Sequence, residues 1–187
     1  MRAIPGLVTL RPADANEVVE AYRYIMQLRH QPAILALSRQ PLPTLDRSKY
    51  ALASGVARGA YMLAEAPGGN PEVILIATGS ELSLAVEAHE KLLAEGIRSR
   101  VVSMPSWDIF DHQSREYRDS VLPPTVKARV AVEQGSTLGW ERYVGESGRI
   151  IGMHTFGASA PLKELQRKFG FEPERVVAAA RELLGKK

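Results

Sequence analysis

Cysteine is absent from the 187-residue chain, and several kinds of site are absent with it. Without thiols the protein can form no disulfide, no cysteine nucleophile and no cysteine-ligated zinc or iron–sulfur centre. No apolar run approaches the roughly 20 residues that a membrane-spanning helix needs. The first residues also lack the long apolar core of a secretory signal. These absences predict a soluble, cytoplasmic protein.

The chain also has little net charge and few aromatic residues. The formal net charge is only +3, and the basic residues are scattered rather than gathered in runs. A nucleic-acid-binding surface is therefore not predicted. Aromatic residues make up 6% of the chain, and no run of basic residues interleaves with the segments around Trp107 and Trp140. These two indoles are expected to pack or to form an interface rather than to stack on bases.

What is present is typical of a globular protein, with 45% apolar and 24% charged residues. The first pattern is an apolar run at residues 7–10, followed by Asp14 and, three residues later, Glu17, which is the spacing of a capping box. A continuous apolar run at residues 33–37 suits a strand buried on both faces. Residues 7–38 therefore predict a strand, a crossover helix and a second strand. The expected apolar face of that helix consists of Val18, Tyr22, Ile25 and Met26.

Residues 40–72 contain Pro- and Gly-rich breaks around a weakly patterned middle, which predicts a linker. The second region is patterned more strongly. Its expected strands are 73–77, 100–104, 128–133 and 150–153, with helices after 78–81 and from Pro161 and Pro173. Strands alternating with helices predict an α/β sheet with helices packed on it.

Arg39 is the most interesting single residue, because it follows the apolar run at the expected carboxyl end of a strand. Ligands of open α/β sheets bind at that end, and a guanidinium can grip a phosphate with two hydrogen bonds there. An ordinary surface ion pair is the competing interpretation.

The turn at residues 78–81 has free amides that could hold an anion, but capping by Thr78 and Glu81 is favoured.

Other kinds of catalytic or metal-binding site find little support in the sequence. His89 lies near the apolar side of its helix, so packing is the favoured interpretation. Residues 108–112 hold two aspartates and a histidine but are too sparse for a calcium loop. The chain has no Gly-x-Ser-x-Gly elbow of a hydrolase.

Five segments, taken together in this order and spacing, resemble the C-terminal part of transketolase. They are Ile4–Leu7 with Arg11–Asp14, Leu37–Gln40, Ile76–Glu81, Val101–Asp111 and Phe156–Pro161. The resemblance covers essentially the whole chain.

The resemblance implies a division of the chain. Residues 1–48 would be the end of the pyrimidine-binding domain, residues 49–66 a linker, and residues 67–187 the complete C-terminal domain. The implied fold is a three-layer, mixed, mostly parallel sheet flanked by helices and preceded by a partial βαβ unit. Arg39 matches the family's arginine that binds the substrate phosphate. The resemblance places no catalytic, cofactor-binding or metal-binding residue in this chain.

The implied activity is that of the parent enzyme, a transferase of the pentose phosphate pathway. It moves a two-carbon ketol unit from a ketose phosphate to an aldose phosphate, with thiamine diphosphate and Mg²⁺ or Ca²⁺ as cofactors. The implied partners are these sugar phosphates and a second copy of the enzyme, with no nucleic acid and no membrane. The chain alone is expected to be inactive and structural.

Two alternatives are kept. One is a related thiamine-dependent enzyme, such as deoxyxylulose-phosphate synthase or the decarboxylating subunit of a 2-oxo acid dehydrogenase; the long match at residues 103–111 argues against it. The other is a free-standing binding or assembly module. In that case Arg39 would be incidental, and residues 1–48 would form a partner-docking surface.

Overall fold

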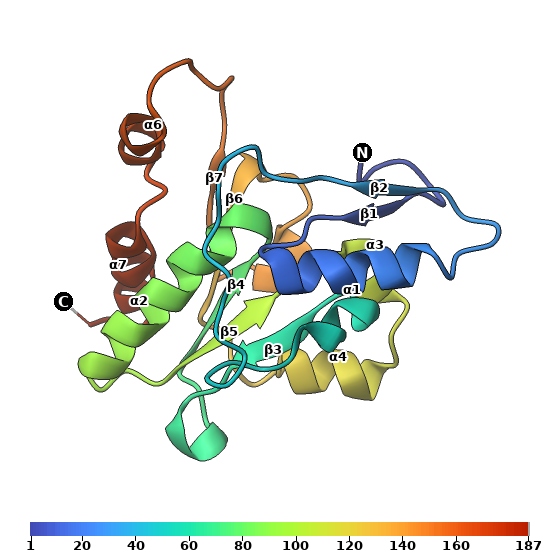
Figure 1. Cartoon of the computed structure of the whole chain (residues 1–187). Coiled ribbons are helices and arrows are strands. Elements are labelled where there is room, and N and C mark those ends of the chain that lie inside the picture. Colours follow the sequence, from blue (N-terminus) through green and yellow to red (C-terminus); the bar gives the residue numbers. More distant parts are fainter. Residues whose placement is uncertain (187) are drawn as a thin grey trace.

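The smaller of two sheets lies at the beginning of the chain, in a computed structural model that describes residues 1–186 (Figure 1). Strands β1 (Val8–Leu10) and β2 (Ala33–Leu35) pair in parallel, and helix α1 (Ala15–Ile25) connects them. This is the strand–helix–strand unit that the sequence predicts.

The larger sheet has five strands in the order β3-β5-β4-β6-β7. Its strands are β3 (Tyr61–Ala64), β4 (Val73–Ala77), β5 (Ser99–Ser103), β6 (Arg129–Ser136) and β7 (Arg149–Met153). Every neighbouring pair is parallel except β3 and β5, which are antiparallel. The mixed, mostly parallel sheet implied by the resemblance is confirmed.

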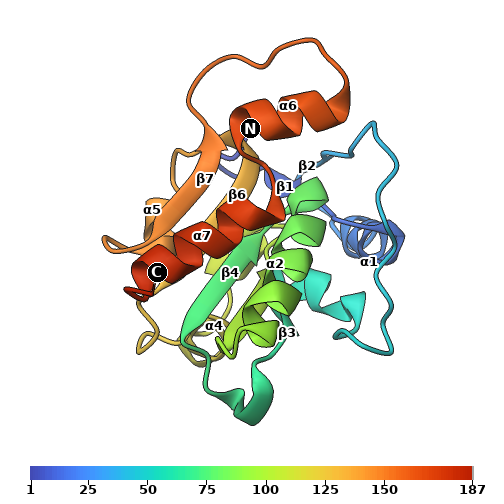
Figure 2. The same ribbon diagram turned by 90° about the vertical axis from the view of Figure 1, so that its left-hand side faces the viewer.

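Helices cover both faces of this sheet (Figures 1 and 2). On one face lie α2 (Leu82–Ala94) and α7 (Pro173–Leu183), side by side. On the other lie the short helices α3 (Trp107–Asp111), α4 (Arg115–Val121) and α5 (Glu141–Val144). Helix α6 (Leu162–Phe169) has no buried residue. Short 3₁₀ segments are η1 (Ala53–Arg58), η2 (Pro67–Gly69) and η3 (Gly79–Glu81). None of the helices in the described residues has the length and apolarity to span a bilayer.

Strand β4 shows why the sheet is buried on both faces. Its five residues are all inaccessible to solvent. Val73, Leu75 and Ala77 belong to the apolar cluster under α2 and α7, whereas Ile74 and Ile76 belong to the cluster under α3, α4 and α5. Because successive side chains of a strand point to opposite faces, a continuous apolar run is what a doubly covered strand requires.

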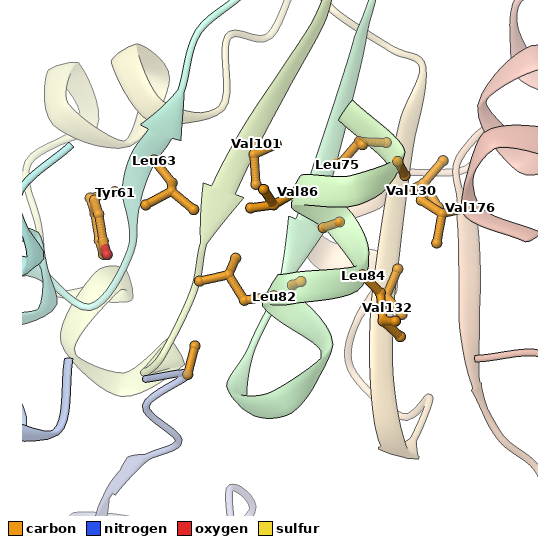
Figure 3. Packing of buried hydrophobic residues seen from close by; sticks show 14 of the residues in the cluster. Tyr61, Leu63, Leu75, Leu82, Leu84, Val86, Val101, Val130, Val132 and Val176 are labelled. Atoms are coloured by element: carbon orange, nitrogen blue, oxygen red, sulfur yellow. The ribbon is translucent and has the colours of Figure 1, made fainter. Parts of the chain in front are cut away.

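The cluster under α2 is drawn in Figure 3. Leu82 and Val86 of α2 lie over Leu75, Val101 and Val130 of the three central strands. This packing fixes α2 across the sheet, and with it the turn that precedes the helix.

Residues 49–66 differ from the sequence prediction, because this expected linker contains η1 and the edge strand β3. Tyr61 of β3 is opposite Ser103 of β5 in an antiparallel register with one irregularity. The strand has only four residues, and only alternate ones are buried. So short a strand leaves too little periodic pattern to be recognised.

Helix α1 also differs in part. Asp14 caps it as predicted, accepting a 2.8 Å hydrogen bond from the Glu17 amide. The expected apolar face is right only in part, however, since Val18 and Ile25 are half-buried, whereas Tyr22 is 51% and Met26 75% exposed. The buried residues of α1 are Glu17 and Ala21. A two-stranded sheet offers little apolar surface, so the helix packs mainly against η1.

Candidate functional site

Arg39 lies where the sequence places it, beyond the carboxyl end of β2. The backbone turns there, with the Gln40 amide donating to Ser38 Oγ at 3.3 Å. The Arg39 side chain is exposed, and no carboxylate of residues 1–186 lies within ion-pair distance of it. The competing interpretation, a surface ion pair, therefore has no partner in the described chain. A free guanidinium at this end of a parallel strand is suited to an anionic ligand.

The end of β1 is fastened to the larger sheet by Arg11. Its Nη1 donates to Glu81 Oε2 at 2.6 Å and to the Thr78 carbonyl at 3.2 Å. The Arg11 backbone adds two links, donating to the Pro105 carbonyl at 2.8 Å and accepting from the Gly79 amide at 3.0 Å. The carboxyl ends of the two sheets are thus held together by one residue.

The turn at residues 78–81 is not the capping arrangement that the sequence predicts. Thr78 Oγ1 donates to the Arg11 carbonyl, and Glu81 accepts from Arg11 and from the Gln134 amide. Glu81 is fully buried, and its carboxylate makes the turn unsuitable for an anion. Gly79 has a φ of +58°, and a Cβ on it would lie 3.0 Å from the Arg11 side chain. Glycine is needed for both reasons.

Glu133 of β6 is a second carboxylate at the same junction. Its Oε2 accepts from Arg2 Nη1 and from Trp140 Nε1, both at 2.6 Å. The Arg2 guanidinium lies 4.0 Å from the centre of the Trp107 ring. Trp107 in turn meets Trp140 edge to face, with ring centres 4.9 Å apart. Packing of the two indoles, the sequence-based expectation, is confirmed.

A cleft of about 520 Å³ opens beside this junction. Its lining includes Thr9, Arg11, Ala36, Trp107, Glu133 and Arg142, but not Arg39. Its guanidinium groups are already paired: Arg2 and Arg11 with glutamates, and Arg142 with Asp111 at 2.9 Å. Within the described residues, the buried Thr9 Oγ1 and Trp107 Nε1 have no hydrogen-bond partner. The cleft therefore offers polar atoms and an aromatic wall, but little unbalanced charge.

A separate buried network joins α1 to the larger sheet. Glu17 is inaccessible to solvent and accepts from Tyr61 Oη at 2.7 Å, Ser103 Oγ at 2.6 Å and the Ala13 amide at 2.8 Å. Burial raises the pKa of Glu17, and the hydrogen bonds from Ser103 and Tyr61 oppose that rise. Burial also raises the pKa of Tyr61. The capping spacing identified Glu17, but nothing local indicated that it reaches another sheet.

Asp14 strengthens the same junction. Its carboxylate accepts two hydrogen bonds from Arg47 Nη2, at 3.0 and 2.8 Å, and one from the Leu45 amide at 3.1 Å. The Asp14 side chain is fully buried, so Arg47 supplies the charge that compensates for its lost hydration. The segment that follows Arg39 is thereby fixed against α1.

The remaining titratable candidates serve the fold. His89 is 4% exposed, its Nδ1 lies 2.8 Å from Ser99 Oγ, and burial lowers its pKa, so the packing interpretation is confirmed. Asp108 accepts from the Thr9 amide at 3.1 Å. Asp111 accepts from Arg142 and from Tyr143 Oη, each at 2.9 Å.

Comparison with known proteins decides the family. A family model described as the transketolase-like C-terminal domain matches residues 59–172, more than half of the chain. The chain belongs to the transketolase family. The resemblance read from five segments is thereby confirmed. The match begins just before β3, inside the segment that the sequence predicts as a linker.

Curated relatives extend the match to the whole chain. Transketolase of Geobacillus stearothermophilus is 49% identical over 186 residues, and transketolase 1 of Escherichia coli is 51% identical over 184 residues. These matches cover 100% and 98% of this chain but 28% of each relative. The chain thus corresponds to the C-terminal part of transketolases and spans about 28% of their length.

Solved transketolases share the fold. The enzyme from Leishmania mexicana superimposes with a TM-score of 0.90 at 40% identity, over 98% of this chain and 26% of its own. A Pichia stipitis transketolase in complex with sedoheptulose-7-phosphate gives 0.87 at 39% identity, over 100% of this chain and 27% of its own. The family is one of transferases, so the parent enzyme class of the chain is also supported.

Proposed function

We propose that this chain supplies the C-terminal part of a working transketolase, which transfers a two-carbon ketol unit from a ketose phosphate to an aldose phosphate. In this proposal Arg39 binds the substrate phosphate. The observation that carries it is the exposed Arg39 guanidinium, which has no counter-charge in residues 1–186 and stands at the carboxyl end of a parallel strand. Two parallel N–H···O bonds from a guanidinium can orient a phosphate.

Neighbouring bonds support this role for Arg39. The bonds of Arg11 hold β1 against the larger sheet, and those of Asp14 hold the segment after β2 against α1. Arg39 is therefore presented from a fixed frame rather than from a loose end. The crystal structure of a family member with sedoheptulose-7-phosphate agrees with a sugar phosphate as the ligand class.

The proposal includes thiamine diphosphate and Mg²⁺ or Ca²⁺ as cofactors of the parent enzyme. Residues 1–186 contain no group of three His, Asp or Glu side chains arranged to hold a metal ion, so the described chain does not fit that role. The chain's own task is to orient the substrate and to stabilise the active enzyme. Alone, it is expected to show no transferase activity.

A homodimeric parent enzyme and a cytoplasmic location complete the proposal, as does the absence of nucleic-acid and membrane partners. Exposed apolar side chains on α1, such as Tyr22 and Met26, are consistent with further protein contacts. The location stays a prediction, because a relative from Solanum tuberosum is described as chloroplastic.

A chimera tests the proposal directly. The matched C-terminal part of Escherichia coli transketolase 1 is replaced by this chain, and ketol transfer is measured with a ketose phosphate donor. We expect activity, and we expect Arg39→Ala to raise KM by about tenfold or more, the effect of losing charge-assisted hydrogen bonds. Arg39→Lys should keep part of the affinity that Arg39→Ala loses. The lysine ammonium supplies the positive charge but not the two parallel N–H donors of the guanidinium.

Two controls make the result specific. Arg29→Ala removes another exposed arginine of the same unit and should leave KM unchanged. A donor without phosphate should show no difference between Arg39→Ala and the unaltered chimera. An inactive but folded chimera contradicts the proposed function, and equal losses with both donors contradict the role of Arg39.

A further inference from the structure

A second hollow, of about 730 Å³, lies on the face covered by α3, α4 and α5. Its charged lining residues are Arg115, Arg118, Arg129, Arg142, Asp111 and Asp119. We call this hollow the arginine groove. It belongs to the five-stranded sheet, whereas Arg39 follows the two-stranded one.

The charges of the arginine groove do not balance. Four guanidinium groups face two carboxylates, which leaves a formal excess of positive charge. Arg142 pairs with Asp111 at 2.9 Å and Arg115 with Asp119 at 3.4 Å, so both carboxylates are engaged. Arg118 and Arg129 form no ion pair within residues 1–186. The cleft described above is different, since each of its arginines has a carboxylate partner.

Arg129 is the unusual member, because it is held firmly without a counter-charge. Its Nε donates to the Val126 carbonyl at 3.0 Å and its Nη1 to the Tyr143 carbonyl at 2.7 Å. Its Nη2 donates to the carbonyls of Leu122 and Pro123, at 3.2 and 2.8 Å. Carbonyl oxygens satisfy the N–H groups but leave the net charge in place. A guanidinium has five N–H groups, and these bonds occupy four of them.

Arg118 supplies an exposed counterpart, unpaired within residues 1–186. It is exposed on α4, and its side chain makes no hydrogen bond to any residue of the described chain. A fixed guanidinium beside a free one, in a hollow with excess positive charge, attracts a compact anion that can accept several N–H bonds.

We propose that the arginine groove binds a phosphate dianion, either free or as the ester of a small metabolite. The dianion would balance the two unpaired guanidinium groups, Arg118 and Arg129. Phosphate is favoured over a single carboxylate because its several oxygens can accept from more than one arginine at once. This site is separate from Arg39 and does not depend on the proposed function.

Titration of the whole chain by NMR tests the proposal. Inorganic phosphate and glycerol 2-phosphate are the two probes, each added at constant ionic strength set with sodium chloride. We expect saturable shifts of the amides in residues 115–129. Tighter binding of the ester than of phosphate would assign the groove to a metabolite, and equal binding would assign it to free phosphate; both support the proposal.

Three variants separate the arginine groove from other arginines. Arg118→Gln should weaken binding about fivefold or more, a loss typical of a charge-assisted hydrogen bond, and should not disturb the fold. Arg175→Gln is the matched control, because Arg175 is also an exposed helical arginine without an ion pair in residues 1–186. Arg39→Gln should leave the groove shifts unchanged. Arg129 is kept, since its bonds hold the backbone.

Several results would overturn the proposal. One is an affinity that falls equally in Arg118→Gln and Arg175→Gln, because it would show non-specific attraction. Another is a loss of the shifts in Arg39→Gln, which would move the binding to that residue. Shifts that grow without saturation, or that sodium chloride produces alone, would also refute a phosphate site.

Discussion

In the five-stranded sheet every residue of β4 is inaccessible to solvent, whereas β2 in the two-stranded sheet is only half-buried along its length. The larger sheet has helices on both faces and an apolar cluster under each layer. The smaller sheet has one connecting helix, whose buried residues are Glu17 and Ala21. Apolar packing therefore holds the larger sheet together. The smaller unit joins it through buried apolar residues such as Val8 and Leu10, and through polar contacts of Arg11 and Glu17.

Exposed apolar side chains show the same contrast. The smaller unit, residues 1–48, exposes Met1, Ile4, Val19, Tyr22, Met26 and Leu37. No residue of β4 or β5 is exposed. Two strands with a single helix cannot cover both of their faces, so such a unit is marginal unless other elements support it. Four sets of substitutions test this difference between the two units.

The largest effect is expected in the core of the larger sheet. Leu75→Ala removes a fully buried side chain and leaves a cavity, at a cost of about 3–5 kcal/mol in the free energy of unfolding. Leu35→Ala in half-buried β2 should cost only about 1–2 kcal/mol, because less contact is lost. Urea denaturation followed by circular dichroism measures both. Equal losses would contradict the difference between the sheets.

The junction between the sheets comes next. Glu17→Ala leaves the hydroxyl groups of Tyr61 and Ser103 without their acceptor, and we expect a loss of about 2–4 kcal/mol. Glu17→Gln keeps one acceptor oxygen and should cost less. Hydrogen exchange should show early opening of residues 8–35 in Glu17→Ala, with β4 still protected. Uniform opening of both sheets would show that they unfold as one unit.

A smaller effect depends on pH. Burial lowers the pKa of His89 below its ordinary value of 6.5, so the unfolded chain takes up a proton more readily than the folded one. The stability that neutral His89 contributes is present above pH 6.5 and is lost as the pH falls through the lower, folded-state pKa.

His89→Gln should remove this part of the pH dependence. Unfolding free energies measured between pH 7.5 and about 5 should fall less steeply in the variant than in the unaltered chain. Burial raises the pKa of Glu17, which acts with the opposite sign, but Glu17 is the same in both proteins. If the unfolding free energies of the two proteins fell equally steeply with decreasing pH, the prediction would be refuted.

The smallest effect is expected at an exposed ion pair of α1. Arg23 pairs with Glu20 at 2.6 Å, three residues apart on one helix, and its side chain is 68% exposed. Arg23→Gln should change stability by no more than about 0.5 kcal/mol, because solvent and salt screen such pairs. The urea midpoint measures it. A loss as large as that of Glu17→Ala would mean that surface charge, not the buried junction, supports the smaller unit.

Much of the fold could be predicted from the sequence, because several of its strands contain continuous apolar runs. Residues 73–77 are the clearest case, with five apolar residues bounded by turn-forming ones. The cap at Asp14 was equally readable, since its acceptor and donor are three residues apart. Strand β3 was missed because it lies within a weakly patterned segment and only two of its four residues, Tyr61 and Leu63, are buried.

The site was predicted less completely. The position of Arg39 at the end of β2 followed from the strand before it, while its role stays a prediction. The capping assigned to Glu81 was wrong because its partner, Arg11, is 70 residues away in the chain. The charge excess of the arginine groove was also invisible, since its arginines come from segments as far apart as α4 and α5.

The fold class, the main strands and the family could be inferred from the amino-acid sequence, since these depend on apolar periodicity, local caps and motif order. Tertiary structure alone decided which charges are compensated. Glu17 and Asp14 look like ordinary capping residues until Ser103 and Arg47 are brought to them from distant segments. The physical reason is that the free energy of a buried charge depends on the partners that folding places within hydrogen-bond distance, and short-range sequence patterns do not record those partners.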